Sequence, residues 1–516
     1  MLQEKIVSIR KGERLLDALK RRGYKGLPSN CVINKTLPGL GVTHCELMSD
    51  RDSIIVEPNV PAIKGKLEKY RHALGAYSGV SPHVIADYLS APSDCRKKIL
   101  ITPNDFFTIK EIMRELNINM FEDFFLFLDE CEKDFPIENL KEDFFLFRNR
   151  SFVTSTSFIT NDPMLEKQGF YILTLCPEYE YKQKLRLITT NNIVETLTAQ
   201  LSALKGPVCI FSHSVETLDS LVSDIPLLQE EGHVFREEEV FPSLQGKRYL
   251  PGVPAELKRF SLFDSDYYLA VDMEMPSPPH LILVSGLFGN QPSFIDPKTE
   301  AVQIAGRFRR GVESMTHISN INPELSFYTP KQARAWLKNA GKVYNGWVRK
   351  MATTHHEGAR ELLQEAVSQS RYARFVDESG NLSLIRVAKF IEQETVKGLY
   401  TQAKLLEEAY ERTNCFTVSH TREVHIFSDK DRLSLQRKLT QEGRNRLLLT
   451  RFEQLEVLRK LHSSKAQTRY RHLINQLINN PSDDFLYNCF LEYGSNFIRN
   501  SGFKEHIMRK ALNRNA

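Results

Sequence analysis

Between residues 31 and 160, short apolar and β-branched runs alternate with amphipathic stretches, and this alternation limits the folds open to the chain. The apolar runs stand at residues 31–35, 53–57, 98–102, 124–128 and 151–155. Continuous apolar runs of this length suit parallel strands that are buried on both faces of a sheet. The segments between them have helical spacing, with Ser81 and Asp105 as suitable N-cap residues. The pattern therefore predicts a doubly wound α/β domain.

The alternation continues further along the chain and gives way to helical spacing after about residue 323. A strand at 207–211, a helix at 215–223 and a buried strand at 280–285 predict a second α/β unit. Helices are expected at 329–350, 358–374, 384–413, 429–463 and 465–478. We therefore predict an α/β fold with two parallel-sheet domains and a mostly helical C-terminal region. The expected boundaries are 1–165, 166–325 and 326–516.

Composition excludes several classes of protein. A length of 516 residues, 41% of them hydrophobic and 26% charged, is typical of a soluble globular protein of two to four domains. The first residues are polar, so no signal sequence is expected, and no apolar run approaches the roughly 18 residues of a membrane span. The eight cysteines are scattered without a C-x-x-C pair. This favours a cytoplasmic location and argues against a zinc site or a disulfide framework.

Positive charge is concentrated near the C-terminus. Residues 431–516 carry 16 Lys/Arg against 8 Asp/Glu, a net charge of +8, so the other 430 residues sum to −3 within the total of +5. A basic segment on a slightly acidic body favours a polyanionic partner such as a nucleic acid. The alternative is a solvated helical surface, on which Lys and Arg are common.

A glycine-rich turn follows the first predicted strand. Residues 38–43 read Pro-Gly-Leu-Gly-Val-Thr, and such a turn before a helix points backbone N–H groups at phosphates. Gly39 and Gly41 allow the tight turn, and the Thr43 hydroxyl stands where a Mg²⁺ ligand belongs. Val42 occupies the position of the P-loop lysine, so charge-assisted bonds worth about 1.5–3 kcal/mol each are missing.

Three other lysines are candidates to replace the missing cation. Lys35 lies on the preceding strand and is expected to be a poor replacement. Lys64 and Lys66 follow the second strand, and the sequence does not show whether either of them reaches the turn.

Two further signals stand at the carboxyl ends of predicted strands, the edge at which open α/β sheets bind ligands. Asp129-Glu130-Cys131-Glu132 follows the apolar run at 124–128, and Thr154-Ser155-Thr156 ends the run at 151–155. Each signal alone is also common in loops that bind nothing. Their order and spacing, about 24 residues apart, favour a joint role.

The strongest signal is the stretch from Gln303 to Arg310, which reads Gln-Ile-Ala-Gly-Arg-Phe-Arg-Arg. It fits a Q-x-x-G-R-x-x-R pattern that supplies arginines to a bound nucleotide. Arginine fingers of this kind contribute about 10³–10⁵ in the rate of phosphoryl transfer. Arg309 is expected to face the surface or a nucleic acid. The alternative interpretation is an ordinary cationic helix terminus.

Taken together, the four signals resemble a superfamily-2 helicase of the DEAD/DEAH type, over roughly residues 25–320, with a degenerate phosphate loop. The resemblance implies two RecA-like domains of the P-loop NTPase type with ATP and Mg²⁺ between them. The overall style is also similar to helicase-like proteins of bacterial mobile elements and phages. A nucleic acid, DNA or RNA, is expected in the cleft and on the basic segment 431–516, with replication or transfer proteins as further partners and no membrane.

The resemblance also implies a role for each matching residue. The residues expected around the nucleotide are Gly39, Gly41, Val42, Thr43 and Asp272. The remaining roles fall to Thr43 and Asp129 as Mg²⁺ ligands, Glu130 beside the attacking water, Arg307 and Arg310 at the γ-phosphate, and Gln303 positioning its loop.

Other positions support or weaken the resemblance. Residues 57–59 (Glu-Pro-Asn) and 102–104 (Thr-Pro-Asn) stand where such helicases contact the nucleic-acid backbone. Asp264 and Asp266 depart from the pattern, because many relatives have threonine and a basic residue there.

Three functions remain open at this point. The leading hypothesis is an ATP-dependent nucleic-acid translocase or helicase. Its rival is a pseudo-helicase that binds nucleic acid as a scaffold with little or no hydrolysis, which Val42 favours. The third is an unrelated α/β enzyme that carries similar short motifs.

Overall fold

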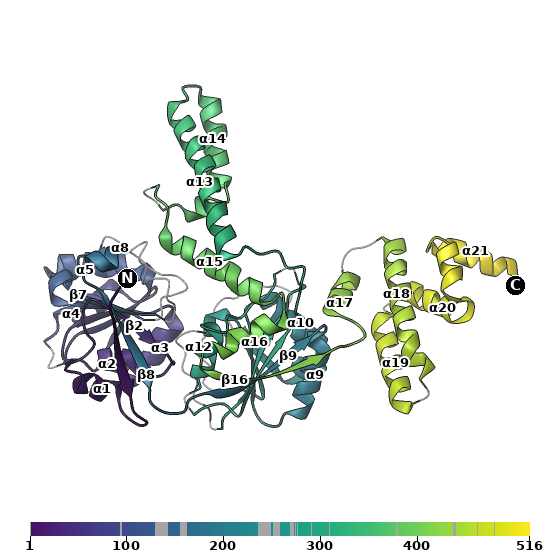
Figure 1. The fold of residues 1–516 in the computed structure, drawn as a ribbon, viewed down its shortest axis with the longest axis horizontal. Coiled ribbons are helices and arrows are strands. Elements are labelled where there is room, and N and C mark those ends of the chain that lie inside the picture. Colours follow the sequence, from purple (N-terminus) through teal and green to yellow (C-terminus); the bar gives the residue numbers. More distant parts are fainter. Residues whose placement is uncertain are drawn as a thin grey trace.

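The structure is a computed structural model. Figure 1 shows two α/β domains, a projecting helical hairpin and a helical C-terminal module, which comprises the helices within residues 429–515. The residues that it describes are 2–92, 95–129, 143–154, 163–235, 249–250, 258–268, 273, 275, 277–289, 291–308, 310–377, 380–436, 440–461, 463–478 and 480–515.

The first sheet is parallel at every described pairing. Its strands, in spatial order, are β1 (Glu4–Ile9), β8 (Tyr171–Pro177), β2 (Cys31–Lys35), β7 (Asn149–Thr154), β6 (Phe125–Leu128), β3 (Ser53–Val56), β5 (Lys98–Ile101) and β4 (Leu74–Ala76). The central strands are short apolar runs, and separate buried clusters cover the two faces of the sheet. The expected strands are therefore present, because continuous apolar runs need cover on both sides.

Helices flank the first sheet, and most of them begin just past the carboxyl end of a strand. They are α1 (Leu15–Arg21), α2 (Val42–Leu47), α3 (Val60–Lys69), α4 (Pro82–Ser90), α5 (Phe106–Glu115), α6 (Met120–Asp123) and α8 (Pro163–Lys167). Parallel pairing puts the carboxyl ends of all the strands at one edge. Since β3 pairs with β6, with Val56 opposite Leu128, the residues that follow these two strands are neighbours.

The second sheet is also parallel at every described pairing. Its order is β12 (Tyr249–Leu250), β11 (Gly232–Phe235), β13 (Phe260–Phe263), β10 (Val208–Ser212), β14 (His280–Ser285), β15 (Ser314–Ser319), β9 (Gln183–Thr190) and β16 (Phe416–Glu423). Its flanking helices are α9 (Ile193–Ala203), α10 (Val215–Asp224), α11 (Pro226–Glu231) and α12 (Glu300–Gly306). The edge strand β16 comes from the region expected to be helical. The sequence did not predict it as a strand, because its mostly exposed or half-exposed polar residues lack the apolar run of a buried strand.

The C-terminal region is mostly helical, as expected. Its helices are α13 (Pro330–Thr353), α14 (Glu357–Gln369), α15 (Leu384–Leu399), α16 (Ala403–Glu411), α17 (Asp429–Gln436), α18 (Gln441–Lys460), α19 (Ser464–Leu477), α20 (Pro481–Asn500) and α21 (Glu505–Asn515). One apolar cluster joins α13 to α15, and another joins α18 to α21. The predicted fold class, two RecA-like parallel-sheet domains and a helical C-terminal region, is confirmed.

The domain boundaries of the sequence analysis remain predictions. The first sheet continues beyond residue 165 to β8, and the second recruits β16 from beyond residue 325. Among the helices that the structure describes, none is long and apolar enough to cross a membrane.

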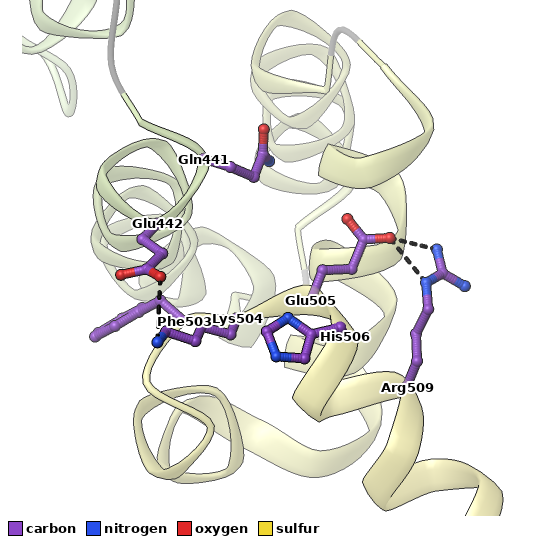
Figure 2. Close-up of a pocket in the computed structure, with 7 residues that line it drawn as sticks. All are labelled: Gln441, Glu442, Phe503, Lys504, Glu505, His506 and Arg509. Atoms are coloured by element: carbon purple, nitrogen blue, oxygen red, sulfur yellow. Dashed lines mark hydrogen bonds and ion pairs between the residues drawn. The ribbon is translucent and has the colours of Figure 1, made fainter.

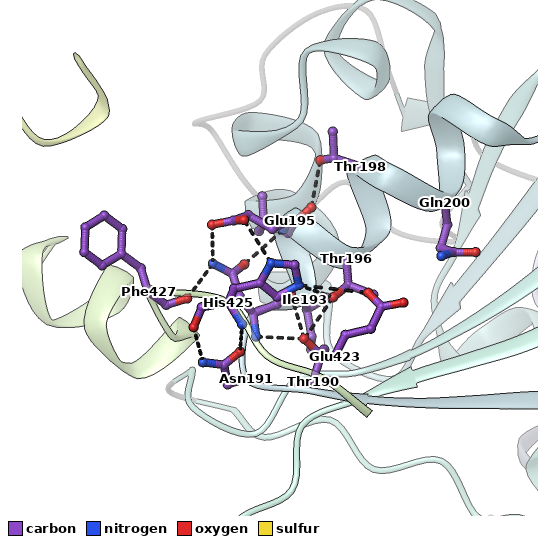
Figure 3. Close-up of polar contacts among 12 residues, drawn as sticks. Thr190, Asn191, Ile193, Glu195, Thr196, Thr198, Gln200, Glu423, His425 and Phe427 are labelled. Atoms are coloured by element: carbon purple, nitrogen blue, oxygen red, sulfur yellow. Dashed lines mark hydrogen bonds and ion pairs between the residues drawn. The ribbon is translucent and has the colours of Figure 1, made fainter. Parts of the chain in front are cut away.

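A polar network ties the segment after β16 to the second domain (Figure 3). The Asn191 side chain bonds both backbone groups of His425, at 2.8 and 2.7 Å, and the His425 ring lies 2.9 Å from Glu195. Asp429, at the start of α17, accepts hydrogen bonds from the Ile193 N–H at 2.8 Å and from the Asn320 amide at 2.9 Å. The base of the C-terminal module is therefore fixed on the second domain.

Candidate functional site

The predicted phosphate loop, residues 38–43, has the backbone that its glycines predict. Gly39 and Gly41 both have φ of 82°, a left-handed conformation that other residues seldom adopt. The helix α2 then begins at Val42, whose side chain is 4% exposed and packs in the core of the first domain. Position 42 therefore contributes its backbone to the loop, while its side chain points into the core.

The two candidate Mg²⁺ ligands come together. The Thr43 hydroxyl donates a hydrogen bond to Oδ2 of Asp129, which is buried directly after β6. The Asp129 N–H donates to the Val56 carbonyl at 2.9 Å, so the strand pairing fixes the position of its backbone. The contact brings together oxygen ligands that stand 86 positions apart in the chain.

A lysine from α3 reaches the same carboxylate. Lys66 Nζ lies 2.9 Å from Asp129 Oδ2 and also pairs with Glu57, the buried residue that follows β3. Its side chain is 18% exposed, so the ammonium is partly open to solvent. Lys64, the other candidate on this helix, is exposed, and its ammonium lies 5.9 Å from the Tyr77 ring centroid. The structure therefore decides between the two lysines that the sequence left open.

Burial and charge shift the pKa values in this cluster. Burial raises the pKa of Glu57 to about 7, although Lys66 opposes the shift. Burial would also raise the pKa of Asp129, but Lys66 and Lys35 together lower it to about 2. Burial disfavours the Lys66 ammonium, and the two carboxylates outweigh this and raise its pKa. At neutral pH, Asp129 is therefore ionised and Lys66 is charged.

The arginine motif is split between buried and exposed positions. Gln303, on α12, and Arg307, directly after this helix, are both buried. The Arg307 guanidinium donates to the Gln303 backbone carbonyl at 3.1 Å and to its side-chain oxygen at 2.5 Å. Arg310, beyond the end of the helix, is exposed. The two arginines predicted at the phosphate therefore differ in their freedom to move.

The two domains meet where the phosphate loop approaches α12. Leu37 packs against the apolar core of the second domain, and the Cys415 thiol lies 3.7 Å from the Thr36 carbonyl. A Cβ atom at Gly306 would overlap the Pro38 ring, so the close approach requires glycine at this position. The start of the loop and the arginine motif therefore lie against each other.

Some predicted site residues cannot be placed. Glu130, Ser155, Thr156, Asp272 and Arg309 lie outside the described residues, and of Thr154 only the backbone is described. Asp264 is buried at the end of β13.

The donor set around Thr43 suits magnesium. Mg²⁺ takes oxygen ligands and usually keeps several waters, with one or two carboxylates and substrate phosphates completing its shell. The Thr43 hydroxyl and the Asp129 carboxylate are ligands of this kind. Within the described residues, no group of three or more His, Cys, Asp or Glu side chains forms a separate metal site.

Sequence reasoning did not predict the buried ion pair between Lys66 and Glu57. Glu57 was expected beside a nucleic-acid backbone, but it is fully buried, so that expectation is wrong for this residue. Asn59 caps α3 by accepting a hydrogen bond from the Ala62 N–H at 2.9 Å. The available signal was a glutamate directly after a buried strand with a lysine on the following helix.

A pocket of about 400 Å³ lies elsewhere, in the C-terminal module (Figure 2). Its lining residues are Gln441, Glu442, Phe503, Lys504, Glu505, His506 and Arg509. Four of the charged ones form ion pairs, Lys504 with Glu442 at 3.6 Å and Arg509 with Glu505 at 2.6 Å. Its charged groups are thus largely satisfied, and it shares no residue with the Thr43–Asp129 cluster.

Comparison with protein families and with curated proteins finds no significant match. Among solved structures, the Mycobacterium smegmatis helicase Lhr bound to ssDNA and AMP-PNP is similar at 13% identity and a TM-score of 0.37, over 75% of this chain and 52% of that one. The Escherichia coli DEAH/RHA helicase HrpB is similar at 10% identity and a TM-score of 0.40, over 90% and 61% of the two chains. A second structure, of the E. coli DExH-box NTPase HrpB, has 11% identity and a TM-score of 0.34, over 88% and 57%.

The chain spans between about half and three fifths of the length of these solved structures. They are helicases, as is the class that the sequence resembles. The chain has two RecA-like domains. The polar cluster Thr43–Asp129–Lys66 lies at the strand-end edge of the first domain.

Proposed function

We propose that this protein is an ATP-dependent nucleic-acid translocase or helicase of the superfamily-2 type. The observation that carries the proposal is the convergence of Thr43, Asp129 and Lys66 beside a glycine-rich loop. The arginine motif of the second domain lies against the start of that loop, at Pro38. A hydroxyl, a carboxylate and an ammonium at the strand-end edge of a parallel sheet suit a nucleoside triphosphate.

In this proposal, ATP lies between residues 39–43 and the arginine motif. Thr43 and Asp129 would hold Mg²⁺, which when bound neutralises charge on the phosphate oxygens. Glu130 would orient the attacking water. Arg310 is exposed and free to turn toward the γ-phosphate, whereas Arg307 must first give up its bonds to Gln303.

The proposed partner is a single strand of DNA or RNA, held in the cleft and by the basic segment 431–516. We also propose a cytoplasmic location, an origin in a mobile element or phage, and replication or transfer proteins as further partners. The support for these points is the charge distribution and the resemblance of the sequence.

A second function, the pseudo-helicase scaffold, is favoured by a specific observation. Lys66 already pairs with both Glu57 and Asp129, so a metal ion would compete with an ammonium for the same Asp129 oxygen. In a scaffold, this pairing would close the site permanently and the protein would bind nucleic acid without hydrolysis.

ATP hydrolysis with and without single-stranded DNA separates the two functions. An active motor should be stimulated by DNA, and Glu130→Gln should reduce its rate by about 10²-fold or more, because general-base catalysis contributes on that scale. Val42→Lys is a poor gain-of-function test, since Val42 lies in the core. Absence of hydrolysis in a chain that still binds DNA would refute the motor and support the scaffold.

A further inference from the structure

The loop lacks a cation at the position where a P-loop has one. The Val42 side chain lies in the core of the first domain, and the Thr43 side chain faces Asp129 on the other side. A phosphate bound at residues 39–43 would therefore need its positive charge from a different element.

The helix α3 brings an ammonium to this position. Asn59 caps the helix, and Lys66 lies almost two turns further along. Lys66 and Thr43 both contact Oδ2 of Asp129, so the ammonium lies directly beside the hydroxyl of the loop. The proposed Mg²⁺ would lie beside the Thr43 hydroxyl and bind the phosphates of the nucleotide. Because the Lys66 ammonium contacts the same Asp129 oxygen as this hydroxyl, it is within reach of these phosphates.

The buried Glu57 holds the lysine on this side. Its carboxyl group pairs with Lys66 while Lys66 also contacts Asp129, so two carboxyl groups fix the ammonium between β3 and β6. With 18% of its side chain exposed, Lys66 remains accessible to a ligand. Lys35, at the end of β2, is a second and more deeply buried cation near the same carboxylates.

We propose that Lys66 of α3 is the phosphate-binding cation of this protein and replaces the missing P-loop lysine. The inference rests on the proposed nucleotide site. In the free protein the ammonium bonds Asp129 and Glu57, and in the complex it also donates to the phosphate oxygens.

Nucleotide binding by the full chain tests this role without depending on turnover. We expect Lys66→Met to weaken the binding of ADP and of a non-hydrolysable ATP analogue by about tenfold or more, and Lys66→Arg to retain most of it. Lys64→Met, on the exposed face of the same helix, is the matched control and should bind as the wild type does.

A double variant separates binding from folding. Lys66→Met alone leaves Glu57 without its cation, whereas Lys66→Met/Glu57→Gln removes the pair and leaves no extra buried charge. If the double variant melts as the wild type but still binds nucleotide weakly, the assignment stands. Recovery of wild-type affinity in the double variant would overturn it. Failure of the wild type to bind any nucleotide would instead refute the nucleotide site itself.

A separate observation carries a second inference, about the projecting hairpin. The helix α13 contains six Lys/Arg and no Asp or Glu in 24 residues, and all six are exposed. At 100° per residue, five of them fall within an arc of roughly 80°, on a side of the helix away from the buried Ala333 and Leu337. These five residues are Lys331, Arg334, Lys338, Lys342 and Arg349, and we call them the α13 stripe.

The α13 stripe differs from the basic segment 431–516 in how many of its cations form ion pairs with carboxylates. Among the described Lys/Arg of residues 431–516, nine form ion pairs, for example Arg444 with Asp483 at 2.6 Å and Arg451 with Asp431 at 2.6 Å. No residue of the stripe pairs with a carboxylate anywhere in the described chain. The stripe therefore offers unneutralised charge.

The position of the stripe suits a long, flexible polyanion. The α13–α14 hairpin projects away from both sheets (Figure 1). The stripe extends from Lys331 to Arg349, about 27 Å along the helix axis, which spans roughly eight phosphates at the 3.4 Å spacing of a stacked, B-form strand. A linear array of phosphates matches this line of cations better than a compact acidic patch would.

We infer that the α13 stripe is a binding surface for the backbone of a nucleic-acid strand. It deepens the proposed function by naming the surface. Binding there neutralises up to five phosphates, so it should be steeply dependent on salt.

The test compares two quintuple variants with equal changes in charge. Replacement of the α13 stripe by glutamines should weaken binding of a 20-nucleotide DNA at least about tenfold and flatten the log–log salt slope by up to about 3.5. The control replaces five exposed cations around α1, which are Lys11, Arg14, Lys20, Arg22 and Lys25. The control should keep most of the affinity, and neither variant should change ATP hydrolysis measured without DNA.

Tryptophan fluorescence gives a local readout. The chain has two tryptophans, Trp336 and Trp347, and both lie on α13. DNA should change this fluorescence in the wild type and in the control but not in the stripe variant. Equal loss of affinity in both quintuple variants, or binding to phosphatidylserine vesicles instead of DNA, would overturn the assignment. A wild type that binds no nucleic acid at low salt would refute the proposed partner itself.

Discussion

At the scale of residues, four ionisable side chains meet at one edge of the first sheet, where two lysines balance two carboxylates. Lys35 and Lys66 face Glu57 and Asp129, and the two carboxylates are buried after neighbouring strands. An unpaired charge in such a place would cost several kcal/mol, whereas the balanced set is tolerated. A bound triphosphate would bring negative charge, and Mg²⁺ would bring compensating positive charge. The cluster therefore suits the complex of Mg²⁺ with a triphosphate better than the metal ion or the triphosphate alone.

A buried histidine in the second domain yields a pH-dependent prediction. His317 lies 3.0 Å from the Ser285 hydroxyl and 2.9 Å from the Tyr410 hydroxyl, and burial lowers its pKa to about 3. The unfolded chain has a histidine pKa of about 6.5, so it takes up the proton first as the pH falls. The stabilisation is thus complete above about pH 6.5 and is lost progressively toward pH 3.

The expected loss is up to about 1.4 kcal/mol per pH unit below pH 6.5. Denaturant unfolding of the second domain at pH 7.5 and 5.5 measures it, with His317→Gln as the reference that does not titrate. The wild type should lose more stability than the variant over this interval. An equal loss in both proteins would show that His317 is not the titrating group.

At the scale of elements, the contact between α12 and the phosphate loop depends on the absence of a side chain. Gly306 ends α12 against Pro38, and Leu37 packs into the core of the second domain. The ring of proline cannot rotate away, so an added methyl group must separate the two elements. Within the described residues, this contact connects the phosphate loop to the arginine motif.

Gly306→Ala should therefore open the domain contact while each domain stays folded. We expect a larger radius of gyration in small-angle scattering and at least about tenfold slower ATP hydrolysis, since arginine fingers contribute about 10³–10⁵ in rate. Gly346→Ala on α13 is the control, because a Cβ atom there meets nothing within 4 Å. It should leave the scattering unchanged and stabilise the hairpin by about 0.5–1 kcal/mol. Unchanged scattering and rate in Gly306→Ala would contradict the role of the contact.

At the scale of the whole molecule, the helical C-terminal module is attached to the second domain by a small number of buried polar contacts. Asp429 accepts hydrogen bonds from Ile193 and Asn320, while Arg432 pairs with Asp224 on α10. The apolar cluster of α18–α21 is separate from the clusters of the second domain. The orientation of the module thus depends on directional bonds that single substitutions can remove.

Asp429→Ala should loosen the module without unfolding the RecA-like domains. Two hydrogen bonds are lost and a buried N–H group is left without a partner, which costs about 1–3 kcal/mol. Limited proteolysis should then cut the chain near residues 424–440 faster than in the wild type. Asp484→Ala, at an exposed position of α20, should be cut at the wild-type rate. Equal cleavage of the two variants would mean that Asp429 is not the anchor.

Much of the fold was predictable because it depends on local patterns. Apolar runs long enough for a strand but too short for a helix defined β2, β3, β5 and β6, and residues at their carboxyl ends had to meet at one edge. Thr43 and Asp129 were recognisable for this reason. The edge strand β16 was missed, since it is half-exposed and carries no apolar run.

The sequence by itself determined the class of fold, the glycine turn and the order of the candidate site residues, because each depends on neighbours within a few positions. The tertiary structure alone decided that Lys66 rather than Lys64 reaches Asp129, that Glu57 is buried, and that Arg307 bonds Gln303. It also decided that the α13 stripe forms no ion pair with the carboxylates of the described residues. The physical reason is that a long charged side chain chooses its partner among groups brought together by strand pairing and helix packing, and these groups are far apart in the chain.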